Sequence, residues 1–202
     1  DTVNFKAWEL YQRGLNSLYL MNKESLNEAA DHFLRSIEID NNFGQAYSYL
    51  AFTISHFVFL GFSKNSEGDI KKAKFYVEKA LDCDNRDSLA HEMLARIYSL
   101  SKNHDQAVEA AKKAIECNVN SSSAYMFYAS ALTFANRCEE ALEPIDQAIK
   151  LSPRDPRTFN FLMNKAMIVG EMGDLKLSVD LARKAVAIPQ GDFRPALILA
   201  IY

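Results

Sequence analysis

The four histidines are the first residues in this chain that could bind a metal ion or transfer a proton. They are His32, His56, His91 and His104, and no two of them are four residues apart, the spacing of two metal ligands on one face of a helix. His104 and Asp105 fall in a stretch that the repeat pattern below predicts as a turn, where polar residues are expected. The sequence also lacks a glycine-rich phosphate loop and a Gly-x-Ser-x-Gly motif. We therefore expect no enzyme activity, no metal site and no cofactor.

The three cysteines are the other candidates for chemistry. Cys83 and Cys117 occupy the same position in successive repeats, and this position is otherwise apolar, so we expect both to be core residues. Equivalent positions in stacked helical repeats are about 8–10 Å apart, which is too far for a disulfide. Cys138 is predicted to lie in a turn beside Arg137, and it is the best candidate for a reactive thiol.

An internal repeat predicts the elements that position these residues. Residues 88–121 and 122–155 align without a gap over 34 residues each. In the first copy, Ala107, Ala111 and Ala114 share one face of a helix, where small side chains let a second helix approach closely. The matching residues of the second copy are Ala141, Ile145 and Ala148. A single helical hairpin cannot bury such a stripe, so the pattern predicts a stack of hairpins.

The same period extends over most of the chain. We predict five hairpins, at about residues 5–42, 44–87, 88–121, 122–155 and 156–191. In the second hairpin, an insertion of roughly ten residues is expected to lengthen the first helix to about Leu60, followed by a polar loop in which Gly61 and Gly68 act as stops. A last helix at 193–202 either caps the stack or begins a further repeat. Because no linker is rich in Gly, Ser or Pro, we expect one all-α domain over residues 1–202.

The 34-residue pattern resembles the tetratricopeptide repeat, most closely in the third and fourth hairpins. The resemblance implies a right-handed α-solenoid in which the first helix of each hairpin lines a concave groove. It also implies that the second, fifth, sixth, ninth, twelfth and thirteenth residues of each repeat point into that groove. The resemblance further implies a non-catalytic module that binds proteins or peptides.

At these positions, hairpins two to five carry mostly apolar residues. We predict that a protein or peptide ligand contacts Tyr49, Phe52, Met93, Arg96, Phe127, Phe134, Asn160, Phe161 and Asn164. Such a groove fits an amphipathic helix or an extended peptide. Family members that clamp a peptide carboxylate use Lys, Arg and Asn here, and the absence of Lys argues against such a clamp. The alternative is that several of the aromatic residues pack inside the stack, since helical spacing alone fits both arrangements.

Composition narrows the classes of partner. The net charge is −3 and no basic stripe is visible, so we do not expect direct contact with nucleic acid. The longest apolar run, at residues 57–60, is too short to span a bilayer, and no signal peptide is visible. We therefore predict a cytoplasmic protein that acts away from membranes.

Two short motifs carry a narrower resemblance. Residues 7–14 (Ala-Trp-Glu-Leu-Tyr-Gln-Arg-Gly) and 151–159 (Leu-Ser-Pro-Arg-Asp-Pro-Arg-Thr-Phe) look like the C-terminal repeat region of bacterial class III nucleotide cyclases and winged-helix transcriptional regulators. This resemblance implies the regulatory part of a larger bacterial signalling or transcription protein. The alternative is an oligomerisation scaffold, with a second copy of the chain as partner, that uses residues 57–62 or the C-terminal helix.

Overall fold

The computed structural model describes residues 4–153 and 158–188. All regular secondary structure in these residues is helical, which confirms the predicted all-α class. The elements are α1 Phe5–Ser17, the 3-10 helix η1 Leu18–Leu20, α2 Lys23–Ile39, α3 Gly44–Phe59, α4 Ser66–Cys83, α5 Ser88–Leu100, α6 His104–Cys117, α7 Ser122–Phe134, α8 Cys138–Leu151, α9 Thr158–Glu171 and α10 Leu175–Val186. The helix predicted at 193–202 lies outside the described residues.

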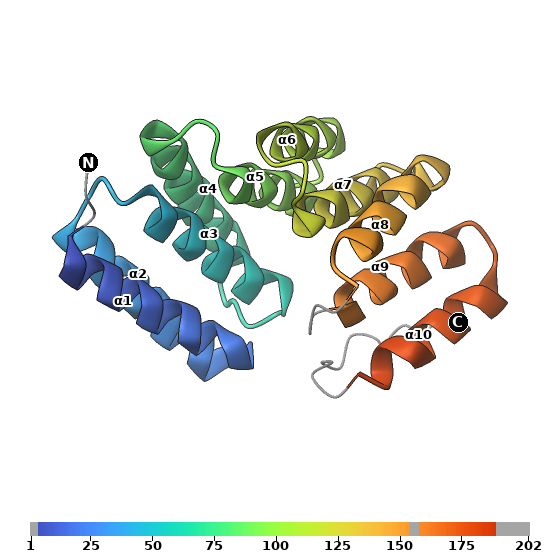
Figure 1. The fold of residues 1–202 in the computed structure, drawn as a ribbon, viewed down its shortest axis with the longest axis horizontal. Helices are drawn as coiled ribbons and strands as arrows, with labels where there is room; N and C mark the ends of the chain where they lie inside the picture. The colour runs from blue at the N-terminus through green and yellow to red at the C-terminus, as the bar shows by residue number, and fades with distance from the viewer. Residues whose placement is uncertain (1–3, 154–157, 189–202) are drawn as a thin grey trace. The chain divides into compact units, whose positions relative to one another are not determined.

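The chain packs as two compact units, residues 1–103 and 104–202. Helices α1 to α5 belong to the first unit and α6 to α10 to the second (Figure 1). The division falls in the turn of the third predicted hairpin, so α5 and α6 belong to different units. The expectation of a single domain stays a prediction.

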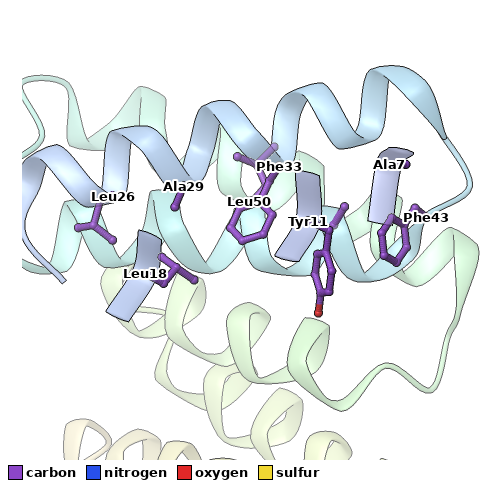
Figure 2. Close-up of a cluster of buried hydrophobic side chains, with 9 residues drawn as sticks. Ala7, Tyr11, Leu18, Leu26, Ala29, Phe33, Phe43 and Leu50 are labelled. Atoms are coloured by element: carbon purple, nitrogen blue, oxygen red, sulfur yellow. The ribbon is translucent and has the colours of Figure 1, made fainter. Parts of the chain in front are cut away.

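The core of the first unit is built around Phe33, which is completely buried on α2. Helix α1 packs against α2, α2 against α3, and α3 against both α4 and α5. Figure 2 shows Phe33 beside Tyr11 from α1 and Leu50 from α3. Gly14 lies where α1 approaches closest to Phe33, because a Cβ added there would be 2.5 Å from a ring carbon. A small residue at this position therefore sets how closely α1 and α2 pack.

A buried serine joins the two helices of the first hairpin and of the last one. The Ser36 hydroxyl on α2 donates a 2.7 Å hydrogen bond to the Ala7 carbonyl oxygen on α1. In the second unit, the Ser178 hydroxyl on α10 donates a 2.8 Å bond to the Ala166 carbonyl oxygen on α9. Since both serines are fully buried, each bond satisfies a hydroxyl that would otherwise be desolvated without a partner.

The second unit repeats the hairpin arrangement. Helix α6 packs against α7, α7 against α8 and α9, α8 against α9, and α9 against α10. A cluster of buried residues from the last two helices forms part of its core: Met163, Ala166, Val169, Leu181 and Ala182. Met163 stands where the other hairpins have a small residue, and α9 and α10 still pack closely around it.

Each hairpin turn contains one residue with a left-handed backbone conformation. The φ angles are +48° at Met21, +74° at Gly61, +60° at Lys102, +57° at Asn136 and +90° at Gly173. These residues lie between the two helices of successive hairpins. Left-handed backbone costs most non-glycine residues about 1–2 kcal/mol and is tolerated best by Gly and Asn, so the turns at Met21 and Lys102 are the strained ones.

Several local predictions are wrong, mostly at helix starts. His104 and Cys138 were expected in turns, but they are the first residues of α6 and α8. Gly68 was expected in a polar loop, but it lies in the first turn of α4, where its N–H donates to the Asn65 Oδ1 that caps the helix. Cys83 was expected in the core and is exposed. The lengthened helix of the second hairpin is confirmed, since α3 ends at Phe59, one residue before the predicted end.

Candidate functional site

One face of α3 carries a row of aromatic rings. Tyr49, Phe52, His56 and Phe59 are spaced three, four and three residues apart, so their side chains share one side of the helix. The ring centroids are 6.3 Å apart from Tyr49 to Phe52, 5.3 Å from Phe52 to His56 and 6.0 Å from His56 to Phe59. Phe59 is 41% exposed, Tyr49 and Phe52 are half-buried, and His56 is buried. The row therefore runs from the core of the first unit to its surface.

Arg96 on α5 lies against this row. Its guanidinium carbon is 5.6 Å from the centre of the Phe52 ring and 5.4 Å from that of Phe59, both within the range of a cation–π contact. Its Nη1 donates a 2.8 Å hydrogen bond to His56 Nδ1. Arginine can only donate, so this ring nitrogen is the acceptor and carries no proton. We call Tyr49, Phe52, His56, Phe59 and Arg96 the α3–α5 aromatic face.

Buried polar groups are found in the helices that carry this face. Glu92 is only 2% exposed on α5 and accepts a 3.4 Å hydrogen bond from the Ser88 hydroxyl. The Ser48 hydroxyl on α3 donates to Asp87, which caps α5. Desolvation raises the pKa of Tyr11 far above its usual value, with smaller contributions from nearby Tyr49 and Asp87. The Ser48–Asp87 hydrogen bond ties α3 to the start of α5, the two helices that carry the aromatic face.

In the second unit, the predicted ligand residues on α7 and α9 differ widely in exposure. Phe134, the last residue of α7, is 46% exposed, whereas Phe127 and Phe161 are buried. Asn164 accepts a 2.6 Å hydrogen bond from Ser130 and donates a 2.8 Å bond to the Asn160 carbonyl oxygen. The Asn164 side chain therefore joins α7 to α9, and Phe134 is the aromatic side chain of this set that reaches solvent.

The nine predicted contact residues thus fall into two groups. Met93, Phe127 and Phe161 are buried, and the Met93 sulfur lies 3.6 Å from the Ser55 hydroxyl. The six half-buried or exposed residues are Tyr49, Phe52, Arg96, Phe134, Asn160 and Asn164. Phe127 and Phe161 therefore pack inside the second unit, as the alternative expects, and ligand contact by the six accessible residues stays a prediction.

Sequence reasoning missed two residues of the α3–α5 aromatic face and two exposed aromatic residues of the first hairpin. His56 and Phe59 fall in the insertion predicted in the second hairpin, and no ligand contact is predicted for them, yet both belong to the α3–α5 aromatic face. Trp8 and Tyr19 on the first hairpin are 45% and 70% exposed. The signal for Trp8 and Tyr19 was available, because they occupy the second and thirteenth positions of the first repeat if Gly14 is its small residue.

The described residues give no indication of a metal centre or a membrane span. Among them, no group of three or more His, Cys, Asp or Glu side chains is arranged to hold a metal ion. None of the helices in the described ranges is long and apolar enough to cross a bilayer.

The comparisons with known proteins agree on the repeat. Residues 90–118 match the family model of the tetratricopeptide repeat. The chain has a tetratricopeptide-repeat fold. It is similar to TTC0263, a thermophilic tetratricopeptide-repeat protein of Thermus thermophilus, at 16% identity over 96% of this chain and 97% of that one, with a TM-score of 0.76. A search of the curated proteins finds no match.

Two further solved structures share the fold. PilF of Pseudomonas aeruginosa is 15% identical over 96% of this chain and 81% of its own, with a TM-score of 0.66. YrrB, a tetratricopeptide-repeat protein with an unusual peptide-binding site, is 17% identical over 97% of this chain and 98% of its own, with a TM-score of 0.53. At these identities the comparisons establish the fold, and this fold provides extended surfaces for binding other proteins.

Proposed function

We propose that this chain is a non-catalytic module that binds apolar segments of other proteins through the α3–α5 aromatic face. The observation that carries the proposal is the position of Arg96 across the rings of Phe52 and Phe59. A guanidinium stacked on two rings is held in one orientation, and Phe59 beside it remains exposed. Rigid aromatic and arginine side chains contribute most of the binding energy in protein interfaces.

Phe134 gives the second unit its own contact in this proposal. The ring is 46% exposed at the end of α7, next to helices fixed by the Ser130–Asn164 hydrogen bond. A large exposed side chain on a rigid support loses little conformational entropy when a ligand covers it. Asn160 and Asn164 would contribute polar contacts at the edge of this site.

The wider role that we propose is regulation within a larger bacterial signalling or transcription protein of the cytoplasm. The motifs at 7–14 and 151–159 support it, since they resemble the repeat region that follows an effector domain in cyclases and winged-helix regulators. Determining the sequence of the natural gene product on both sides of this chain tests this. An adjoining effector domain is the expected result, and a product of only these 202 residues would refute it.

The oligomerisation alternative has less support from the first unit. Phe57 and Phe62 contact each other at 5.6 Å between ring centroids and pack against the core cluster of that unit. They therefore cover this core, and Phe59 is the exposed aromatic residue of the stretch.

Selection of a phage-displayed random dodecapeptide library on the purified chain tests the binding function. We expect the selected peptides to be apolar, and Phe59→Ala or Phe134→Ala to weaken the binding of a labelled peptide at least tenfold in fluorescence anisotropy. Phe75→Ala is the matched control, because Phe75 on α4 is 51% exposed, at least as much as Phe59 and Phe134, and belongs to neither surface. The proposal would be refuted if no peptide is enriched, or if Phe75→Ala weakens peptide binding as much as Phe59→Ala and Phe134→Ala do. Phe127 is unsuitable for this test, because truncating a buried ring would destabilise the fold.

A further inference from the structure

His56 is the member of the α3–α5 aromatic face that can gain a proton near neutral pH. The residue is 5% exposed, and its ring is nearly parallel to that of Phe52, with an interplanar angle of 9°. Its Nδ1 accepts the 2.8 Å hydrogen bond from Arg96 Nη1. A neutral imidazole has one acceptor nitrogen and an imidazolium has none, so this hydrogen bond exists in only one protonation state of the ring.

Protonation of His56 would place a second positive charge beside Arg96. Arginine stays charged throughout the pH range of folded proteins, so the two groups would repel each other at hydrogen-bonding distance. Arg96 is the group that can move, because it is half-buried and its side chain is long and flexible. His56 is short and buried, and its ring lies between two phenylalanine rings at centroid distances of 5.3 and 6.0 Å. A proton on His56 should therefore displace the guanidinium.

The ring of Phe52 can stabilise a cation in either arrangement. When His56 is neutral, the guanidinium carbon of Arg96 lies 5.6 Å from the centre of this ring. The imidazole of His56 lies 5.3 Å from the same centre, so a protonated imidazole is already within the range of a cation–π contact. The exposed Phe59 would lose the guanidinium that lies 5.4 Å from its own centre. The face therefore has two discrete arrangements that differ by one proton.

The helices that carry this face place charges of both signs around His56. Helix α3 has no Asp, Glu, Lys or Arg, and His56 lies in its last turn, where the helix dipole attracts cations. Helix α5 contributes Glu92 and Arg96, which are four residues apart and so share one side of that helix. Glu92 is 2% exposed, and a buried carboxylate on that side of α5 favours a proton on His56. Burial and Arg96 oppose that proton.

The other charged groups around α3 are exposed or have partners elsewhere. On α2 and α4, which also pack against α3, every Asp, Glu, Lys and Arg residue is exposed except Asp69 and Lys74, and His32 on α2 is half-buried. Asp69 pairs with a lysine of its own helix, and Lys74 lies over a tyrosine ring of α5. The ring of His91 bonds to a backbone carbonyl that precedes α5, and α1 reaches the far end of the aromatic row through Tyr11. The charges that act on the ring most directly therefore come from α5.

We propose that His56 is a pH-sensitive switch in the α3–α5 aromatic face, whose protonation releases Arg96 from Phe52 and Phe59 and weakens the binding of apolar protein segments. The part that concerns ligand affinity rests on the proposed function, because it assigns a regulation to the same face. The release of Arg96 does not depend on a ligand. Acidification would lower the affinity of the chain for its ligand while the helices stay folded.

The release of Arg96 can be measured by nuclear magnetic resonance on the ligand-free chain, labelled with carbon-13 in arginine and histidine. Side-chain protons of an arginine that lies over two aromatic rings resonate upfield of those of exposed arginines. We expect the Arg96 signals to move to exposed positions between about pH 7.5 and about pH 5, the range in which histidine titrates, and to follow the ring signals of His56. The variants Arg96→Gln and His56→Asn assign these signals. Far-ultraviolet circular dichroism should stay constant over the same range.

Ligand binding is measured by fluorescence anisotropy with a selected dodecapeptide that lacks Asp, Glu and His, so that the ligand itself does not titrate. In the wild type we expect its affinity to fall about tenfold from about pH 7.5 to about pH 5, the equivalent of one hydrogen bond to a charged group. In His56→Asn the two affinities should differ by less than about twofold, because the asparagine oxygen accepts from Arg96 and does not titrate. The matched control is His91→Asn, which removes a half-buried histidine outside the face and should respond to pH as the wild type does.

Three results would overturn the inference. Arg96 signals that stay upfield down to about pH 5 would show that its contacts survive protonation. Loss of helical circular dichroism over the same range would show that acid unfolds the chain, and equal pH dependence of peptide affinity in the wild type and His56→Asn would show that His56 does not control binding. The proposed function fails separately, if no dodecapeptide binds at neutral pH, and the Arg96 signals still decide whether the switch exists.

Discussion

Replacing Gly14 with alanine should destabilise the first unit, although alanine is the better helix former. The added Cβ would lie 2.5, 2.8 and 2.9 Å from three carbons of the Phe33 ring, where ordinary contacts begin at 3.4 Å. The ring cannot easily move away, because it is completely buried and contacts Tyr11 and Tyr49 at centroid distances of 5.9 and 5.8 Å. Overpacking costs about 1–3 kcal/mol, and the helix propensity of alanine offsets about 1 kcal/mol. Three contacts below 3.0 Å place this substitution at about 2–3 kcal/mol of overpacking, so we expect a net loss of about 1–2 kcal/mol in unfolding free energy.

Urea denaturation followed by both Trp8 fluorescence and far-ultraviolet circular dichroism measures this loss. Trp8 lies on the same helix as Gly14, so its transition reports on the first unit even if the second unit unfolds separately. The matched control is Asn16→Ala, an exposed site on α1 where only helix propensity changes. Phe33→Leu should remove most of the clash, so Gly14→Ala should cost at least about 1 kcal/mol less in that background. The steric reasoning would be refuted if Gly14→Ala has the same unfolding free energy as the wild type, or if it costs as much in the Phe33→Leu background as in the wild type.

Three further predictions concern buried polar groups and thiols. Ser36→Ala should lower the unfolding free energy by about 0.5–1.5 kcal/mol, because the buried hydrogen bond between the two helices is lost; an unchanged urea midpoint would contradict this. The raised pKa of Tyr11 means that the unfolded chain loses this proton first as pH rises, so its contribution to stability is complete below about pH 10 and falls above it. The wild type should therefore lose more stability than Tyr11→Phe between about pH 9 and pH 11, and equal losses would show that this hydroxyl is not desolvated. Burial and the nearby carboxylates of Glu171 and Glu139 raise the pKa of Cys138. Iodoacetamide should therefore modify Cys138 at about pH 8.5 more slowly than free cysteine, with the modified site identified by peptide mass spectrometry. An equal or faster rate would contradict the raised pKa.

The helices were predictable because their signals are local. The spacing of Ala107, Ala111 and Ala114 requires one helix face, and the 34-residue period fixes where the next hairpin follows. Helix starts were less predictable, since a polar residue such as Asn22 or Asn65 suits a loop and a cap equally well. The cap is decided by the backbone N–H groups that reach it, as at Ser25 and Gly68.

The candidate site was only partly predictable, for a different reason. Tyr49, Met93, Phe127 and Phe161 occupy the same repeat position, yet Tyr49 is half-buried and the other three are buried. A helical period gives the direction in which a side chain leaves its own helix. It does not give the extent to which neighbouring helices cover it, because that depends on the size of residues elsewhere. Contacts such as Arg96 with His56, forty residues apart, follow from the packing of α5 against α3.

The five left-handed turns have a consequence for engineering. One left-handed residue lies between the two helices of each repeat: Met21, Lys102 and Asn136 hold this position in three repeats, and Gly61 and Gly173 hold it in the other two without strain. Because none of these five residues is a proposed contact residue, substitution with glycine at Met21, Lys102 or Asn136 would change the thermal stability of one turn at a time. A set of chains graded in melting temperature and identical in every proposed contact residue could be made in this way. With such a set, the rigidity of a hairpin and its affinity for a ligand could be varied independently.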